Sequence, residues 1–159
     1  MTRLFLDCDG VLADFDRGAR ALLGMSAGDY LAANGVGDFW KRLAAAPDFY
    51  ANLEPLPDAH RLVDAVRHLE PSILTGLPIG KWAEPQKRAW AERHFPGLPV
   101  ITCFARDKHR HGLHGDVLVD DSLRLAAAWE AMGGAFVHHE NAERSIAALR
   151  QIFPSIGET

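Results

Sequence analysis

Three apolar residues near the start of the chain, Leu4-Phe5-Leu6, run directly into the tetrapeptide Asp7-Cys8-Asp9-Gly10. Side chains two positions apart in an extended segment point the same way, so Asp7 and Asp9 are expected to project together from the end of a buried strand. No globular fold needs two carboxylates there for stability, and like charges so close repel each other. The pattern therefore indicates an active site with a cation beside the carboxylates, and Mg²⁺ is the usual hard cation held by oxygen ligands.

The composition indicates one ordinary globular core. The 159 residues, of which 48% are hydrophobic and 24% charged, are enough for a single core, alone or with a small appended subdomain. The formal net charge of −4 provides no cationic field for DNA or RNA, so no nucleic-acid polymer is expected as a partner. A small anionic ligand remains compatible, because a local lysine and a metal outweigh a modest global charge.

Cysteine usage and hydropathy bear on the cellular compartment. Two cysteines, Cys8 and Cys103, do not indicate a disulfide framework in a chain that can build its own core. No basic segment followed by a long apolar run opens the sequence, and no stretch approaches the length of a membrane span. The expected location is the cytoplasm, with no membrane partner, and oligomerisation is left open.

Five short β-like runs alternate with helical patterns, which is typical of a parallel sheet flanked by helices. The runs cover residues 3–6, 72–74, 99–102, 117–119 and 135–138. Asp58, Ser122 and Asn141 are expected to cap helices at their N-termini. Pro85 suits the first turn of another helix. The sequence therefore predicts an α/β fold.

One interval, residues 16–70, breaks this alternation because it shows only helical segments and turns. Helical patterns cover residues 26–34 and 38–46. Ligands of parallel sheets bind beyond the carboxyl ends of the strands, where this insertion leaves the first strand. We therefore expect a small helical cap over residues 16–70 and a core formed by residues 1–15 and 71–159. The alternative is that the inserted helices are merely additional helices on the core.

Polar residues follow two other strands at the point where each ends. Thr75 and Gly76 come after the second run, and Asp120 and Asp121 come after the fourth. All strands of a parallel sheet end at one edge, so these residues should converge with the two aspartates of the first strand. Four carboxylates around one point require a metal. Lys108, in the polar loop before the fourth strand, would supply a further positive charge.

This constellation resembles the haloacid dehalogenase (HAD) superfamily of phosphatases over the whole chain. The four motifs of that superfamily occur in order: Asp-x-Asp-Gly and apolar residues at 7–12, Thr75 after a strand, Lys108, and the acidic pair Asp120-Asp121. Each motif is weak alone, but four in the right order are specific. The resemblance implies a HAD-like Rossmannoid fold, a three-layer α/β sandwich with five parallel strands in the order 3-2-1-4-5 and a small helical cap after the first strand.

Within the superfamily the sequence is most similar to the 5′(3′)-deoxyribonucleotidases. The first motif reads on through Ala13-Asp14-Phe15, residues 53–57 precede the helix that returns to the core, and Arg106-Asp107-Lys108 carries the third motif. Two segments depart from that family. Thr75-Gly76-Leu77-Pro78 replaces the usual Thr-Ser-Pro, which removes a hydroxyl from the phosphate pocket, and Ser122-Leu123 replaces Arg-Pro after the acidic pair. The cap is also shorter, so the reaction class transfers better than the substrate.

The resemblance implies catalytic roles for the acidic residues. Asp7 would attack phosphorus and form an aspartyl-phosphate. Asp9 would protonate the leaving oxygen and then take a proton from the incoming water. Mg²⁺ would be bound by the Asp7 carboxylate, the Asp9 backbone carbonyl and Asp121, while Asp120 would bind it directly or orient its waters.

The resemblance also implies residues that bind the substrate. Thr75 and Gly76 would hold phosphoryl oxygens, and Lys108 would balance the negative charge of the phosphate. Phe15 and Trp40 are the candidate aromatic residues for stacking on a nucleobase. The alternative for both rings is packing inside the cap.

The expected function is Mg²⁺-dependent hydrolysis of a small phosphomonoester, with a (deoxy)nucleoside monophosphate as the leading substrate. The nearest rival is the same mechanism acting on a sugar phosphate or another small metabolite. A dehalogenase fits less well, because that branch of the superfamily lacks the second aspartate and needs no Mg²⁺. A catalytically silent binding protein is disfavoured by the intact set of acidic residues.

Two other kinds of metal site have partial signals in the sequence. Asp-x-Asp-Gly also begins a calcium-binding loop, but here Val11 and Leu12 interrupt the run of ligands and Gly18 stands at the twelfth position, where a glutamate is needed. His109, His111 and His114 could form a transition-metal site. A polar, glycine-containing loop of mixed charge explains these three histidines equally well.

Overall fold

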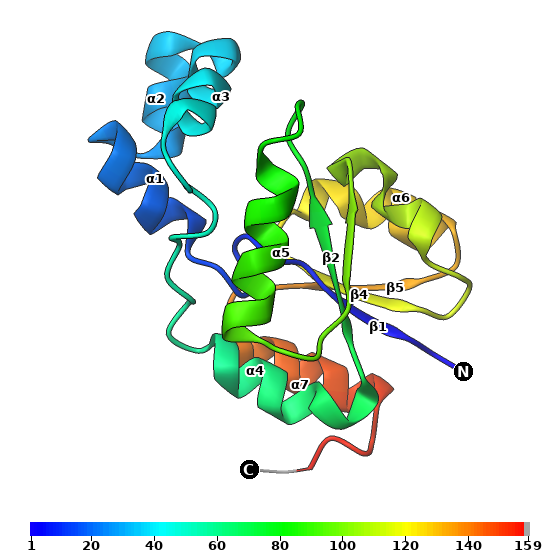
Figure 1. Cartoon of the computed structure of the whole chain (residues 1–159). Helices are drawn as coiled ribbons and strands as arrows, with labels where there is room; N and C mark the ends of the chain where they lie inside the picture. Colours follow the sequence, from blue (N-terminus) through cyan, green and yellow to red (C-terminus); the bar gives the residue numbers. More distant parts are fainter. Residues whose placement is uncertain (158–159) are drawn as a thin grey trace.

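Five parallel strands form a sheet in the computed structural model, which describes residues 1–157 (Figure 1). The strands are β1 (Leu4–Leu6), β2 (Ser72–Gly76), β3 (Val100–Cys103), β4 (Val117–Asp120) and β5 (Ala135–His138). Their order across the sheet is β3-β2-β1-β4-β5. The α/β class and the strand order predicted from the sequence are therefore confirmed, and the short first strand lies at the centre.

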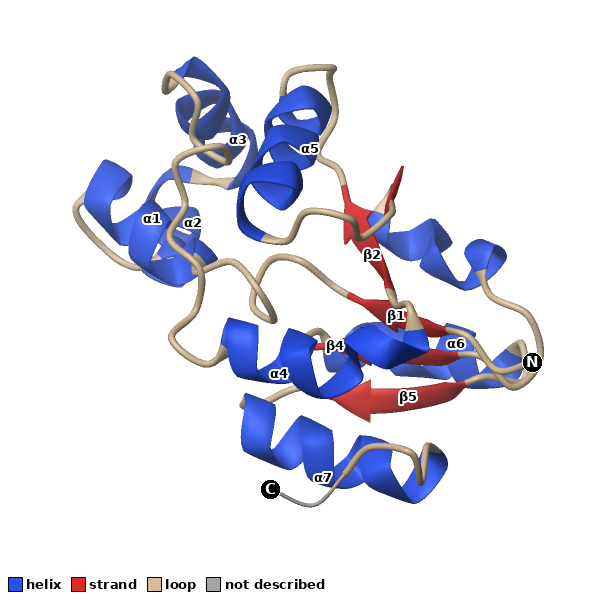
Figure 2. Cartoon of the chain, turned by 60° about the horizontal axis from the view of Figure 1, so that its bottom comes forward, coloured by secondary structure: helices blue, strands red, loops and turns tan. Residues whose placement is uncertain are grey.

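Helices cover both faces of this sheet, which explains why its central strands are apolar on both sides. The core helices are α4 (Ala59–Val66), α5 (Ala83–His94), α6 (Ala126–Ala131) and α7 (Ala142–Ile152). Leu4 and Leu6 pack with residues of α4, α5 and α7, whereas Phe5 points the opposite way and packs with Trp129 of α6. Figure 2 shows α4 and α7 side by side along one face. Within residues 1–157, none of the helices has the length and apolar character needed to cross a bilayer.

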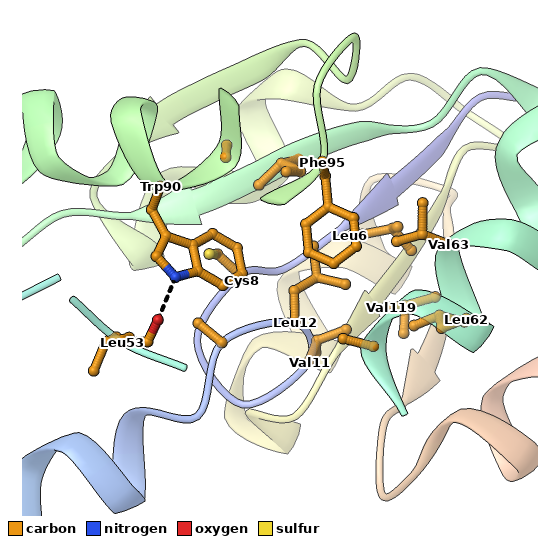
Figure 3. Packing of buried hydrophobic residues seen from close by; sticks show 14 of the residues in the cluster. Leu6, Cys8, Val11, Leu12, Leu53, Leu62, Val63, Trp90, Phe95 and Val119 are labelled. Carbon is orange, nitrogen blue, oxygen red and sulfur yellow. Dashed lines mark hydrogen bonds between the residues drawn. The ribbon is translucent and has the colours of Figure 1, made fainter. Parts of the chain in front are cut away.

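Two large rings fasten α5 to the sheet. Trp90 and Phe95 are 2% and 0% exposed, and Figure 3 shows Phe95 beside Leu6 and Leu12 and Trp90 beside Cys8. Burial of each ring stabilises the fold by about 2 to 3 kcal/mol. The Trp90 Nε1–H also donates to the Leu53 carbonyl at 2.8 Å (Figure 3). Leu53 lies in the segment that returns from the cap, so α5 holds this segment as well as the sheet.

Three helices follow β1 and project away from the sheet as a cap (Figure 1). They are α1 (Phe15–Leu23), α2 (Ala27–Asn34) and α3 (Val36–Ala45). Asp14 caps α1 by accepting from the Arg17 N–H, and Ser26 caps α2 by accepting from the Asp29 N–H, each at 3.1 Å. The helices α2 and α3 match the helical patterns at residues 26–34 and 38–46.

The last helix of the inserted interval lies with the core layers. Helix α4 packs against α7, and its Leu62, Val63 and Val66 are fully buried in the same cluster as β1. The periodicity of a cap helix and a core helix is the same, so sequence alone does not separate them. The division into a core of residues 1–15 and 71–159 and a cap of residues 16–70 stays a prediction about the inserted segment.

Of the three predicted N-terminal helix caps, one is confirmed and two are wrong. Asn141 caps α7 as predicted, through a 2.9 Å bond from the Arg144 N–H. Asp58 does not cap its own helix; its Oδ2 accepts from the Ala142 N–H at 2.7 Å, so it caps α7 from a distance. Ser122 makes no capping bond either, because a short 3₁₀ turn precedes α6. The predictions for Asp58 and Ser122 are wrong because the first turn of a helix also depends on the segments that pack or connect to it.

Candidate active site

The carboxyl ends of β1 and β4 bring three aspartates together. Leu6 pairs with Val119, and the Asp7 N–H donates to the Val119 carbonyl at 2.9 Å, so Asp7 and Asp120 leave adjacent strands side by side. One carboxylate oxygen each from Asp7, Asp120 and Asp121, together called the acidic cluster, lies within 4.8 Å of the other two. The sheet topology therefore assembles acidic residues that are more than a hundred positions apart in the sequence.

Lys108 neutralises part of this charge. It lies in a 3₁₀ segment (Ala105–His111), is 4% exposed, and donates from Nζ to Asp7 Oδ1 and Asp120 Oδ2, both at 2.8 Å. Burial alone would lower the pKa of Lys108, but the charges of Asp7 and Asp120 outweigh burial and raise it. The side chain is therefore a fixed ammonium ion between two carboxylates.

The remaining negative charge of the acidic cluster fits a divalent cation. Burial raises the pKa of Asp7 although Lys108 opposes this effect. Burial, followed by the charge of Asp7, raises the pKa of Asp121 to about 8. Gly10 makes room for the Asp121 carboxylate, because a Cβ at Gly10 would lie 2.1 Å from Asp121 Oδ2. A hard cation with oxygen ligands would relieve the repulsion among these groups, so the residues present fit the Mg²⁺ predicted from the sequence.

The carboxylate of Asp9 is not part of the acidic cluster and meets a different cation. Its Oδ2 accepts a 2.7 Å bond from Nζ of Lys87, and its Oδ1 is buried with no hydrogen-bond partner in the part of the chain that the structure describes. The same Nζ donates to Thr75 Oγ1 at 2.9 Å and to the Gly76 carbonyl at 2.8 Å. The Lys87 ammonium thus has an acceptor for each of its three hydrogens.

Lys87 is a residue of this site that the sequence motifs do not include. It is 3% exposed and shares the buried face of α5 with Ala83, Trp90 and Ala91. Residues three, four and seven positions apart lie on one face of a helix. The available signal was a lysine at an apolar position of the helical pattern, three residues before a buried tryptophan.

Thr75 and Gly76 lie at the end of β2, beside the strand that carries Asp7. Thr75 is 1% exposed, and its hydroxyl oxygen is taken by Lys87. Gly76 packs closely on the next segment, since a Cβ there would lie 3.0 Å from the Ala105 Cβ. Both residues therefore lie at the carboxyl end of β2, as the sequence predicted.

A cavity of about 740 Å³ opens between the strand ends and the cap. Asp7, Asp9, Gly76, Lys108, Asp120 and Asp121 line its core side. Its cap side carries three aromatic residues, Phe15, Trp40 and Tyr50, beside Val36 and Gly37. The Phe15 and Phe49 ring centroids are 5.6 Å apart, and those of Trp40 and Phe39 are 5.0 Å apart. Phe15 and Trp40 therefore belong both to the packed interior of the cap and to the cavity wall. The volume is that of a typical small-molecule site.

Within residues 1–157, the acidic cluster is the one group of three or more His, Cys, Asp or Glu side chains whose ligand atoms come close enough to hold an ion. His109, His111 and His114 do not form such a group. The structure therefore does not support the transition-metal alternative for these histidines: His109 and His111 lie in the 3₁₀ segment Ala105–His111, whereas His114 lies beyond its end.

Comparisons with known proteins bear on the family to which the chain belongs. Residues 1–151 match the family described as 5′ nucleotidase, deoxy (Pyrimidine), cytosolic type C protein. The mitochondrial 5′(3′)-deoxyribonucleotidase of Mus musculus is 30% identical over 149 residues, which covers 79% of this chain and 67% of the mouse protein.

Solved structures share the fold at lower identity. A HAD family hydrolase from Deinococcus radiodurans, with bound phosphate and sodium, superposes with a TM-score of 0.54 at 16% identity, covering 96% of this chain and 88% of that one. The L-2-haloacid dehalogenase of Xanthobacter autotrophicus superposes with a TM-score of 0.57 at 14% identity, covering 100% of this chain and 90% of the dehalogenase chain. These likenesses concern the fold alone. The family match, in contrast, extends over nearly the whole chain, and it shows that this protein belongs to the type C 5′-nucleotidase family of HAD phosphatases and is a phosphoric monoester hydrolase.

Proposed function

We propose that the protein hydrolyses a small phosphomonoester with the help of Mg²⁺ and through a phosphorylated Asp7. The observation that carries this proposal is the acidic cluster at the ends of β1 and β4, with Lys108 between two of its members and a cavity above it. Phosphomonoester hydrolysis is among the slowest uncatalysed reactions, so catalysis depends on charges that are already in position. The buried ion pairs of this site provide such charges.

Asp7 is the proposed nucleophile. A carboxylate attacks phosphorus at neutral pH, and the resulting acyl phosphate is open to water. Lys108 holds Asp7 Oδ1 at 2.8 Å, which limits the rotation of the carboxylate. The same ammonium ion balances negative charge as the phosphoryl group approaches a buried aspartate.

Asp9 is the proposed general acid and base. As the bond between phosphorus and the leaving oxygen breaks, Asp9 gives its proton to that oxygen, and the alcohol departs. In the second step Asp9 takes a proton from the water that attacks the phosphorus of the aspartyl-phosphate. This releases inorganic phosphate and returns Asp7 to its carboxylate form, so protons balance over the cycle.

Asp7, Asp121 and the backbone carbonyl of Asp9 would hold Mg²⁺, which when bound neutralises charge on the phosphoryl oxygens. Asp120 has both carboxylate oxygens engaged, Oδ2 by Lys108 and Oδ1 by the Ser122 N–H at 2.9 Å. These bonds support an orienting role for Asp120. Thr75 and Gly76 would bind phosphoryl oxygens from the end of β2.

The leading substrate is a (deoxy)nucleoside monophosphate. The mouse relative is named a 5′(3′)-deoxyribonucleotidase, and the rings of Phe15 and Trp40 offer faces on which a base can stack. A sugar phosphate or another small metabolite phosphate is the second candidate. It is favoured by Gly76 and Ser122, where that nucleotidase family has other residues in the phosphate and leaving-group regions.

The cytoplasm stays the predicted compartment. The description of the matching family includes the word cytosolic, whereas the mouse relative is named mitochondrial. The proposed binding partner is a small phosphorylated metabolite, and neither a nucleic-acid polymer nor a membrane is expected.

The test is a substrate panel with the purified protein. Deoxynucleoside and ribonucleoside monophosphates are compared with sugar phosphates, with EDTA and after Mg²⁺ is restored. We expect turnover that EDTA abolishes and Mg²⁺ restores, with the highest kcat/KM on a nucleoside monophosphate. Indifference to the base with faster turnover of a sugar phosphate would select the second candidate.

The intermediate is tested separately. Borohydride reduces an acyl phosphate of aspartate to homoserine, and mass spectrometry of protein quenched during turnover should locate that change at Asp7. Labelling at another residue, or none during rapid turnover, would contradict the proposed nucleophile.

A further inference from the structure

Helix α5 places a buried ammonium ion directly beside the reaction centre. Lys87 is 3% exposed, and a buried charge is costly unless hydrogen-bond acceptors surround it. Here the acceptors are Asp9 Oδ2, Thr75 Oγ1 and the Gly76 carbonyl, and the ring of Tyr50 lies 4.4 Å from Nζ on a further side. Every hydrogen of the ammonium has a defined partner, so its position is fixed.

We propose that Lys87 is the positioning residue for Asp9: it holds Oδ2 so that Oδ1 is the oxygen that meets the leaving group and, later, the attacking water. This inference rests on the proposed phosphatase function. It adds a residue from α5, outside the four sequence motifs, to the group of side chains on which the proton transfer depends.

The two oxygens of Asp9 have opposite surroundings. Oδ2 is held at 2.7 Å by Lys87, whereas Oδ1 is buried and has no partner among the described residues. A buried carboxylate oxygen without a hydrogen bond is destabilising. Because Asp9 also lines the cavity, the free oxygen is the one available to a bound molecule. Lys87 prevents the carboxylate from rotating, which would exchange the two oxygens.

The same ammonium ion aligns Asp9 with the proposed phosphoryl-binding end of β2. Its bonds to Thr75 and Gly76 connect the acid to the residues expected to hold phosphoryl oxygens. The next residue back along α5, Gln86, accepts from the Tyr50 backbone N–H at 2.8 Å, and this bond holds the backbone of the residue whose ring lies over Lys87. One turn of α5 therefore sets the proton donor, the phosphoryl site and one wall of the cavity relative to each other.

The competing explanation is that Lys87 only ties α5 to β2. The two explanations differ in how activity depends on the leaving group. An alkyl phosphate such as a nucleoside monophosphate releases a basic alkoxide and needs a proton, whereas p-nitrophenyl phosphate releases a stable phenolate and does not. The parameter to compare is kcat/KM, because it covers the steps up to departure of the alcohol.

The test uses Lys87→Met, which keeps most of the side-chain volume and removes the donors. We expect kcat/KM to fall about 100-fold or more on the best alkyl phosphate and no more than about 5-fold on p-nitrophenyl phosphate, because general acid catalysis contributes on that scale. Adding Asp9→Asn should cost little beyond either single variant, because both remove the same proton transfer. Arg93→Met, an exposed position on α5, is the matched control and should leave both rates unchanged.

Equal losses on the two phosphates, or effects of Lys87→Met and Asp9→Asn that multiply, would overturn the positioning role. If Lys87→Met lowers the melting temperature too far to assay, Lys87→Gln, which retains an amide donor, is used instead. Its kcat/KM should also fall more on the alkyl phosphate than on p-nitrophenyl phosphate. A wild-type protein that hydrolyses neither phosphate would instead overturn the proposed function, together with the inference built on it.

Discussion

The two sides of the cavity are built from different kinds of interaction. The core side is formed by strand ends whose positions follow from sheet register, and its groups are held by charged hydrogen bonds of 2.7 to 2.8 Å. The cap side is formed by rings that contact each other with centroids 5.0 to 6.4 Å apart. Directional bonds fix atoms, whereas ring packing fixes shape. The core side is therefore suited to chemistry and the cap side to choosing the group that leaves.

The largest expected effect tests the core side alone. Asp7→Asn removes the proposed nucleophile while keeping the shape of the side chain. We expect kcat/KM to fall by about 10⁴-fold or more on every substrate in the panel, whatever its leaving group, since nucleophile removal in other hydrolases has effects of that size. The measurement is a rate assay with thermal unfolding as the folding control. Equal rates for wild type and variant would instead point to a silent binding protein with contaminating activity.

The next effect concerns the charge balance of the core side. Lys108→Met leaves the carboxylates of Asp7 and Asp120 buried without their shared cation. We expect the free energy of unfolding to fall by about 3 kcal/mol, because removal of the lysine leaves buried carboxylates without a partner. We also expect kcat to fall about 10³-fold.

Arg110→Met is the matched control for that experiment. Arg110 lies in the same 3₁₀ segment, but its side chain is 73% exposed and its ion pair with Asp107 spans 3.7 Å. Exposed pairs contribute little, so the control should change stability by no more than about 0.5 kcal/mol. If both variants behaved alike, the buried position of Lys108 would not be what matters.

The contrast between the two sides also explains what the sequence could predict. Asp7 and Asp120 were found because a parallel sheet sends all strand ends to one edge, whatever the distance along the chain. Lys108 was found through the order of motifs. The placement of the two aspartates needs only strand identity and topology. Both can be read from short apolar runs such as Leu4–Leu6 and Val117–Val119.

Residues that depend on packing between elements could not be found in this way. The role of Lys87 requires that the buried face of α5 lie over the end of β2, which no local pattern states. Tyr50 lies in an irregular segment without periodicity, so nothing marked it as part of the cavity wall. Asp58 caps α7 instead of its own helix because Ala142 comes close only in the folded chain. The bonds from Lys87 to Asp9 and from Ala142 to Asp58 join residues 78 and 84 positions apart, so no local pattern predicts them.

A smaller effect tests the cap side. Trp40→Ala removes a ring from the cavity wall, and base stacking on an aromatic side chain contributes about 1 to 3 kcal/mol. We expect kcat/KM on a nucleoside monophosphate to fall about 10-fold, and on ribose 5-phosphate, which has no base, no more than about 3-fold. Steady-state kinetics on the two substrates makes the comparison. Equal losses would mean that Trp40 acts only through the packing of the cap, as its contact with Phe39 allows.

The smallest effect on activity is expected at the amino ends of the strands, which lie away from the acidic cluster at the carboxyl ends. Asp116, just before β4, is 1% exposed; it accepts from the Arg3 side chain at 2.6 and 3.0 Å, the Arg3 N–H at 2.9 Å and the Leu113 N–H at 2.8 Å. Burial alone would raise the pKa of Asp116, but these bonds together hold it below the usual 3.8. Asp116→Asn should lower the free energy of unfolding by about 1 to 2 kcal/mol at neutral pH, since a charged hydrogen bond is replaced by a neutral one.

The stability difference between wild type and Asp116→Asn depends on pH, because folding lowers the pKa of Asp116. A carboxyl group whose pKa is depressed by folding stabilises the protein above its unfolded pKa, and this contribution disappears as the pH falls from about 3.8 through the lower folded value. Urea unfolding of wild type and Asp116→Asn between pH 7 and pH 3 should therefore give stability curves that converge on acidification, with kcat/KM of the folded proteins equal at neutral pH. A large loss of activity in this variant would mean that charge anywhere along β4 matters to turnover. The chemistry would then not be confined to the carboxyl ends of the strands.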